Sequence, residues 1–118
     1  MKPLRVLLVE DEGLVAMMLE DLLEDMGCEV VGSLATVAQA MAWIDDGGEA
    51  DAALLDVNLG GETVFAVAEA LAARAVPFAF TTGYGEGHDP RFASAVMLGK
   101  PINQDRLIAA LRAFGFKP

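Results

Sequence analysis

Acidic, hydroxyl and amino side chains stand at the ends of four separate short apolar runs. Glu10 and Asp11 follow the first run, Asp56 ends another, and Thr82 and Lys100 close two more. If these runs are parallel strands of one sheet, their carboxyl ends lie along one edge, where open α/β sheets bind ligands. Each residue alone has an ordinary structural explanation, as a helix cap or a turn. Their ordered placement at four strand ends predicts one shared site.

Carboxylates in one site repel one another unless a cation lies between them. Hard oxygen ligands of this kind suit Mg²⁺, which accepts a few carboxylates and keeps several waters. With the cation bound, Asp56 could attack an incoming phosphoryl group, because carboxylates form acyl phosphates. Lys100 would then pair with one phosphoryl oxygen and Thr82 would donate a hydrogen bond to another.

The elements that must position these residues follow from an alternation of apolar runs and helical periods. This order predicts an α/β fold with a doubly wound, five-stranded parallel sheet and helices on both faces. The expected strands are Leu4–Val9, Glu29–Ser33, Asp51–Leu55, Val76–Thr82 and Val96–Leu98. The expected helices cover Leu14–Met26, a segment capped by Thr36, Glu62–Arg74, and a last segment capped by Asn103. The first helix is expected to carry one apolar stripe, in which Leu14 and Met18 recur with other apolar residues at spacings of three and four.

The fourth connection is predicted to hold a shortened or irregular helix. Tyr84 and Val96 are close in the sequence, and Gly85, Gly87 and Pro90 lie between them. A helix of ordinary length does not fit there, although Arg91 to Ala95 could form one turn.

Composition bounds the remaining possibilities. A chain of 118 residues fits one domain, here residues 1–118, and its formal net charge of −10 disfavours nucleic-acid binding. No apolar run approaches the ~18 residues of a membrane span, and no secretory signal precedes the first strand, so a cytoplasmic protein is expected. Cys28 is interpreted as a reduced thiol and His88 as a solvated loop residue, which leaves no Cys/His metal site.

Four segments together resemble the response-regulator receiver domains of two-component signalling, over essentially the whole length. They are Val6–Glu12, Leu54–Leu59, Thr82-Gly83 and Lys100-Pro101. The resemblance implies a flavodoxin-like strand order of 2-1-3-4-5 and a phosphoprotein that a histidine kinase phosphorylates on Asp56. It implies Mg²⁺ ligation by Asp11, Asp56 and the backbone carbonyl of Asn58, with Glu10 assisting through water. Thr82 and Lys100 would read the phosphorylated state.

Three features depart from the usual family pattern. Met97 occupies the position of the switch aromatic, Gly60-Gly61 follows Leu59 where Pro is more usual, and the fourth helix is curtailed. Because Met97 cannot act as a hydrogen-bonding aromatic, the conformational response is expected to fall on Thr82 to Ser94, with Tyr84 as the aromatic within reach.

The run Pro77–Tyr84 looks like the motif of the single-domain FATGUY subclass of regulators, with Thr81 in place of Ala. That likeness implies a histidine kinase, often of the HWE type, as phosphodonor, and an output through contacts with a downstream protein or a phosphotransfer protein. The chain ends shortly after its last predicted helix, so no attached output domain is expected.

Two other functions fit the residues less well. A phosphatase with Asp56 as nucleophile, of the haloacid dehalogenase type, needs a second acid two residues later, where Asn58 stands. A flavodoxin would need a phosphate-binding loop after the first strand, where Glu10, Asp11 and Glu12 present negative charge instead. No enzymatic activity is expected beyond the chain's own phosphorylation and dephosphorylation. Signalling output, phosphorelay intermediate and phosphate sink remain open.

Overall fold

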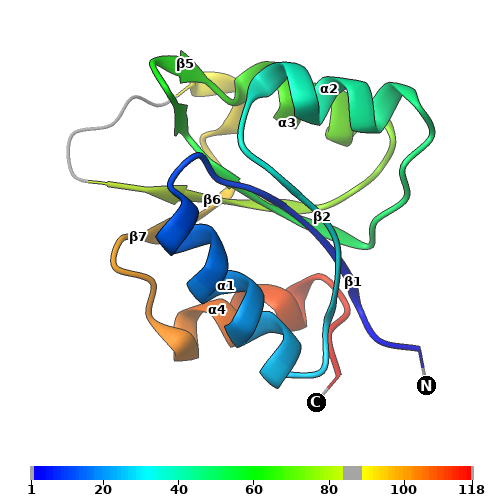
Figure 1. Cartoon of the computed structure of the whole chain (residues 1–118), viewed down its shortest axis with the longest axis vertical. Helices are drawn as coiled ribbons and strands as arrows, with labels where there is room; N and C mark the ends of the chain where they lie inside the picture. Colours follow the sequence, from blue (N-terminus) through cyan, green and yellow to red (C-terminus); the bar gives the residue numbers. More distant parts are fainter. Residues whose placement is uncertain (1, 84–88, 118) are drawn as a thin grey trace.

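The computed structural model of the chain describes residues 2–83 and 89–117 and shows one parallel sheet between two layers of helices (Figure 1). The sheet has five strands in the order β2-β1-β3-β6-β7, which confirms the predicted order 2-1-3-4-5. The strands are β1 (Arg5–Val9), β2 (Glu29–Leu34), β3 (Ala52–Asp56), β6 (Phe78–Thr82) and β7 (Val96–Gly99). All four neighbouring pairs run parallel, so the carboxyl ends of the strands share one edge.

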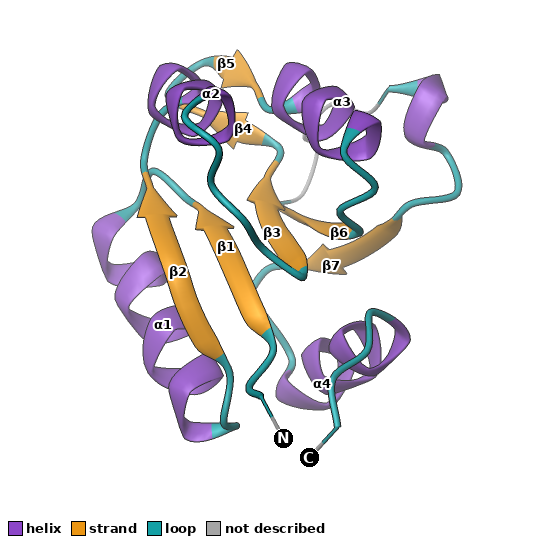
Figure 2. Ribbon diagram, turned by 90° about the vertical axis from the view of Figure 1, so that its right-hand side faces the viewer, coloured by secondary structure: helices purple, strands orange, loops and turns teal. Residues whose placement is uncertain are grey.

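Two helices cover each face of the sheet (Figure 2). They are α1 (Gly13–Asp25) and α4 (Gln104–Ala113) on one side, and α2 (Val37–Asp45) and α3 (Phe65–Ala73) on the other. The predicted caps are present, because the Thr36 hydroxyl accepts from Gln39 N and the Asn103 amide oxygen accepts from Arg106 N. The strand residues alternate between the two faces and form two buried apolar clusters, one under each helix pair.

The segment after the third strand differs from the prediction. Glu62 and Thr63 do not begin a helix; as β5 (Glu62–Thr63) they pair antiparallel with β4 (Asn58–Leu59). Gly60 and Gly61 form the turn with φ angles of 60° and 93°, values that favour glycine in tight hairpins. Helix α3 therefore starts at Phe65, three residues later than expected, and the hairpin lies beside the carboxyl edge of the sheet.

The apolar stripe of α1 is wider than the face that α1 buries. Ala16, Leu19 and Leu23 are buried, whereas Leu14 and Met18 are 79% and 67% exposed, so the sheet covers only part of the predicted stripe. Helical periodicity defines a stripe, but it does not say which part of a wide stripe the sheet covers. The consequence is an apolar surface on α1, to which the exposed Met17 also contributes.

In the described part of the fourth connection, a 3-10 helix, η1 (Pro90–Phe92), replaces a full helix. Tyr84, Gly85, Gly87 and His88 lie outside the described residues. The ring of Phe92 packs against three other phenylalanines, with centroids 5.9 Å from Phe65 and 5.7 Å from both Phe78 and Phe80. This aromatic cluster fixes the short helix to α3 and β6. Among the described helices, none has the length and apolar character needed to cross a membrane.

Candidate functional site

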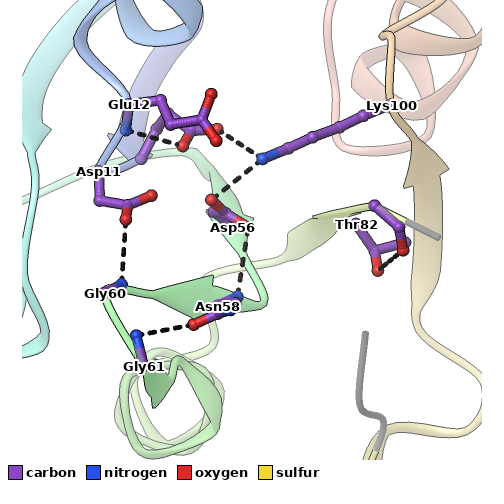
Figure 3. A network of polar contacts seen from close by, with 10 residues as sticks. Asp11, Glu12, Asp56, Asn58, Gly60, Gly61, Thr82 and Lys100 are labelled. Carbon is purple, nitrogen blue, oxygen red and sulfur yellow. Dashed lines mark hydrogen bonds and ion pairs between the residues drawn. The ribbon is translucent and has the colours of Figure 1, made fainter. Parts of the chain in front are cut away.

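The carboxyl edge of the sheet brings four of the predicted residues together (Figure 3). One carboxylate oxygen from each of Glu10, Asp11 and Asp56 lies within 4.8 Å of the others. Glu10 and Asp56 are only 3% and 2% exposed, whereas Asp11 is exposed at the rim. Lys100, the first residue after β7, extends its side chain toward them. The expected convergence of strand ends is therefore observed.

The Asp56 carboxylate is held from two sides. Its Oδ2 accepts from Lys100 Nζ at 3.1 Å, and its Oδ1 accepts from the backbone N–H of Asn58 at 3.2 Å. Lys100 Nζ also lies 3.2 Å from Glu10 Oε1, and a second Glu10 oxygen accepts from the backbone N–H of Glu12 at 3.1 Å. One ammonium group thus serves two buried carboxylates.

Two buried carboxylates beside one ammonium group shift the pKa values of Asp56 and Lys100. Burial, together with the neighbouring Glu10 carboxylate, raises the pKa of Asp56 to about 7, although Lys100 acts in the opposite direction. Burial also lowers the pKa of Lys100, but its contacts with Asp56 and Glu10 outweigh that effect and hold the pKa above the ordinary value. A further positive charge at this edge would therefore stabilise the ionised carboxylates.

The β4–β5 hairpin, which the sequence does not predict, orients two side chains at the exposed rim of the site. Asp11 Oδ2 accepts from the backbone N–H of Gly60 at 3.0 Å, and the Asn58 side-chain oxygen accepts from the N–H of Gly61 at 2.9 Å. Proline at position 60 would have no N–H to donate and could not adopt a φ of 60°. The departure from the usual Pro thus supplies a donor that orients Asp11.

Thr82 lies at the end of β6, apart from the Asp56–Lys100 contact (Figure 3). Its hydroxyl donates to the carbonyl of Gly83 at 3.1 Å. A hydrogen bond from Thr82 to a phosphoryl group on Asp56 would therefore require this hydroxyl to turn away from Gly83.

One further polar side chain reaches the buried part of this region. Thr81 is 1% exposed and pairs in register with Asp56 across β3 and β6. In the sequence, Thr81 stands out only as a replacement of Ala in a motif. The alternation of side chains along β6 could have indicated its buried position, because Thr81 and Thr82 point to opposite faces of the sheet.

Solved structures with the same fold are similar to this chain over nearly its full length. SdrG from Sphingomonas melonis Fr1 is 50% identical, with a TM-score of 0.84 over 97% of this chain and 98% of SdrG. The BeF3-activated conformation of SdrG gives a TM-score of 0.76, again at 50% identity, over 96% of this chain and 98% of that one. The receiver (REC) domain of the Erythrobacter litoralis PhyR response regulator is 27% identical, with a TM-score of 0.78 over 95% of this chain and 89% of that domain's chain.

The sequence is also similar to the phyllosphere-induced regulator PhyR of Methylorubrum extorquens, at 31% identity over 114 residues. The match covers 90% of this chain but 41% of that regulator, so the chain spans less than half of its relative's length. Residues 6–112 match the response regulator receiver domain as a family. The strand order, the acidic edge and these matches lead to one assignment: the chain belongs to the response regulator receiver domains.

Proposed function

We propose that this receiver domain accepts a phosphoryl group on Asp56 from a histidine kinase, in a Mg²⁺-dependent reaction, and signals through contacts with other proteins. The observation that carries the proposal is the buried Asp56 carboxylate, which Lys100 Nζ and the Asn58 N–H hold at the carboxyl edge of the sheet. The family match and the likeness to SdrG support it. No other enzymatic activity is proposed.

The residues at this edge fit a magnesium ion. The candidate ligand atoms are carboxylate and carbonyl oxygens, which Mg²⁺ prefers, and the two buried carboxylates share a single ammonium group. Asp11, Asp56 and the backbone carbonyl of Asn58 would hold the ion, with Glu10 assisting through water. When bound, Mg²⁺ neutralises charge on the oxygens of the transferring phosphoryl group.

In the proposed step, an Asp56 carboxylate oxygen forms a bond to phosphorus while the bond from phosphorus to the donor's imidazole nitrogen breaks. That nitrogen keeps the electron pair of the broken bond, and Asp56 becomes an acyl phosphate. Lys100, which now contacts Asp56 Oδ2, would shift to an oxygen of the arriving phosphoryl group. Thr82 would contact another after its hydroxyl leaves Gly83.

The exposed apolar surface of α1 supports a protein phosphodonor. Leu14, Met17 and Met18 are exposed there. They adjoin a groove of about 120 Å³ whose lining joins α1 to the segment after β7, namely Val15, Met18, Leu19, Leu22, Lys100, Pro101 and Ile102. Because the groove includes Lys100, a helix packed on α1 would bring its phosphohistidine to the edge that holds Asp56. We assign this face to the kinase, which the subclass likeness suggests is of the HWE type.

The finer place in the pathway is also a proposal. We propose a single-domain FATGUY regulator that acts in the cytoplasm, with relay to a phosphotransfer protein or a phosphate sink as the alternatives. The solved SdrG chain, which this domain covers to 98%, supports the single-domain part of this proposal. Incubation of the phosphorylated chain with a histidine phosphotransfer protein distinguishes them, because a relay passes the label on and an output regulator keeps it. Capture of a protein by the phosphorylated form alone would support the output role.

Phosphoramidate, whose P–N bond resembles that of phosphohistidine, tests the proposed reaction without knowledge of the kinase. We expect the wild type to acquire label with Mg²⁺ and not with EDTA, and we expect Asp56→Asn to acquire none. Asp21→Asn, which removes an exposed acid of α1, is the matched control and should label normally. Equal labelling of Asp56→Asn and the wild type would refute the proposal.

A further inference from the structure

Thr81 carries a buried hydroxyl that the proposed reaction does not use. The residue is 1% exposed, and its Oγ1 has no hydrogen-bond partner among the residues that the structure describes. Most buried hydroxyls in proteins are paired, because an unpaired one loses its hydration without compensation. Alanine, the motif residue at this position, would avoid that loss. A use for the hydroxyl within the site explains its presence.

The sheet register places Thr81 between two elements of the site. Its strand partners are Asp56 on one side and Leu98 on the other. Leu54, Ala79 and Leu98 contribute to the apolar cluster under α1 and α4, so Asp56 and Thr81, which lie two residues after Leu54 and Ala79, point to that same face. Thr81 therefore continues the buried face on which the Asp56 carboxylate lies.

To reach Asp56, the Lys100 side chain has to cross the end of β6, the strand that carries Thr81. Strand β6 lies between β3 and β7, so the ends of the outer two strands are about 10 Å apart. Lys100 follows β7, yet its Nζ lies 3.1 Å from Asp56 Oδ2 on β3. An extended side chain that spans this gap passes over the end of β6, where Thr81 is buried.

Thr81 and Lys100 also have complementary hydrogen-bonding capacity. An ammonium group has three donors, and in this structure Asp56 and Glu10 face two of them. The Thr81 hydroxyl offers two lone pairs and no charge. When Asp56 becomes an acyl phosphate, its esterified oxygen is a weaker acceptor, and a neutral acceptor below Lys100 would replace part of the lost contact.

We propose that Thr81 is a positioning residue of the phosphorylation site. Its hydroxyl accepts a hydrogen bond from one buried water that the Lys100 ammonium group donates to, and this bridge holds that group over Asp56. The inference rests on the proposed function for its effect on phosphorylation. The contact with Lys100 can be measured in the metal-free, unphosphorylated protein.

Two substitutions separate the hydroxyl from the shape of the side chain. Thr81→Val keeps the branched shape and removes the hydroxyl, whereas Thr81→Ser keeps the hydroxyl and removes a methyl group. Thr81→Ala, which carries the motif residue, serves as a second hydroxyl-free variant if Thr81→Val does not fold. The first readout is proton exchange of the Lys100 ammonium group, followed by ¹⁵N NMR without Mg²⁺. The second is the phosphorylation rate with phosphoramidate and saturating Mg²⁺.

We expect Thr81→Val to accelerate ammonium exchange and to slow phosphorylation by roughly threefold to tenfold, as for the loss of one ordinary hydrogen bond. Thr81→Ser should stay within about twofold of the wild type in both. The inference would be overturned if Thr81→Val showed the ammonium exchange and the phosphorylation rate of the wild type. It would also be overturned if Thr81→Ser were as defective as Thr81→Val, because the defect would then come from altered packing and not from the missing hydroxyl. Failure of the wild type to accept phosphate would refute the proposed function, while the exchange data would still decide on Thr81.

Discussion

Removal of the Asp56 charge should stabilise the metal-free protein at alkaline pH and not at acidic pH. In the folded chain, burial and Glu10 raise the pKa of Asp56 from an ordinary 3.8 to about 7. In the unfolded chain, the carboxyl loses its proton near the ordinary value. Between these two pH values the folded state binds more protons, so ionisation of Asp56 lowers the free energy of unfolding as pH rises. Asp56→Asn cannot ionise and avoids this loss.

The magnitude follows from the size of the shift. A difference of about three pKa units corresponds to at most about 4 kcal/mol, reached above pH 7 and absent below pH 4. Because Lys100 retains its contact with Glu10 in the variant, we expect Asp56→Asn to be more stable than the wild type by roughly 1–4 kcal/mol at pH 8. At pH 5 the difference should fall to roughly two-fifths of that value, and it should vanish only below about pH 4, where the carboxyl is protonated in both states.

Urea unfolding of the wild type and Asp56→Asn in EDTA, at several pH values from 5 to 8, measures this difference directly. Saturating Mg²⁺ at pH 8 should then stabilise the wild type more than the variant, because the ion needs the Asp56 carboxylate. A stability difference between the two proteins that does not change with pH would refute the electrostatic reasoning for this site.

Three further predictions concern the proposed metal ligand Asp11, the aromatic cluster around Phe92, and the close contact between Gly48 and Trp43. Asp11→Ala should weaken Mg²⁺ binding by about tenfold or more in an NMR titration, whereas Glu12→Ala should change it little; equal affinities would contradict the proposed ligands. Phe92→Ala should lower the free energy of unfolding by about 2 kcal/mol, because it removes contacts with Phe65, Phe78 and Phe80. Glu69→Ala removes only an exposed ion pair with Arg91 and should destabilise the chain clearly less than Phe92→Ala does. Gly48→Ala should destabilise the chain by roughly 1–3 kcal/mol, since the new Cβ would lie 2.5 Å from Trp43 ring atoms, whereas Gly13→Ala meets no atom within 4 Å and should be tolerated; Trp43 fluorescence during unfolding reports both.

The strand order and the location of the site could be predicted from the sequence. Buried parallel strands read as nearly continuous apolar runs, and four of the five strands here end at or just before a polar residue assigned to the site. Lys100 and Asp56 are far apart in the sequence, but the topology of a doubly wound sheet leaves their strand ends on one edge.

Two features could not be predicted because they depend on tertiary contacts. The hairpin at Gly60 and Gly61 arises where the backbone can donate to Asp11, and the local pattern of residues 62–64 reads equally well as the start of a helix. The exposure of Leu14 and Met18 depends on the rotation of α1 against the sheet, which periodicity alone leaves open. The same two features bear on function, because one orients a proposed metal ligand and the other presents an apolar face beside Lys100.

Phosphorylation of Asp56 itself is the most direct test. The intact chain, incubated with a small phosphodonor and Mg²⁺, should gain a single phosphoryl group by mass spectrometry. Borohydride reduction of the acyl phosphate, followed by peptide mapping, should place the modification on Asp56 alone. Asp56→Asn should gain nothing under the same conditions. A modification on any other residue, or a wild type that stays unmodified while Mg²⁺ is bound, would contradict the assignment of Asp56 as the phosphoacceptor.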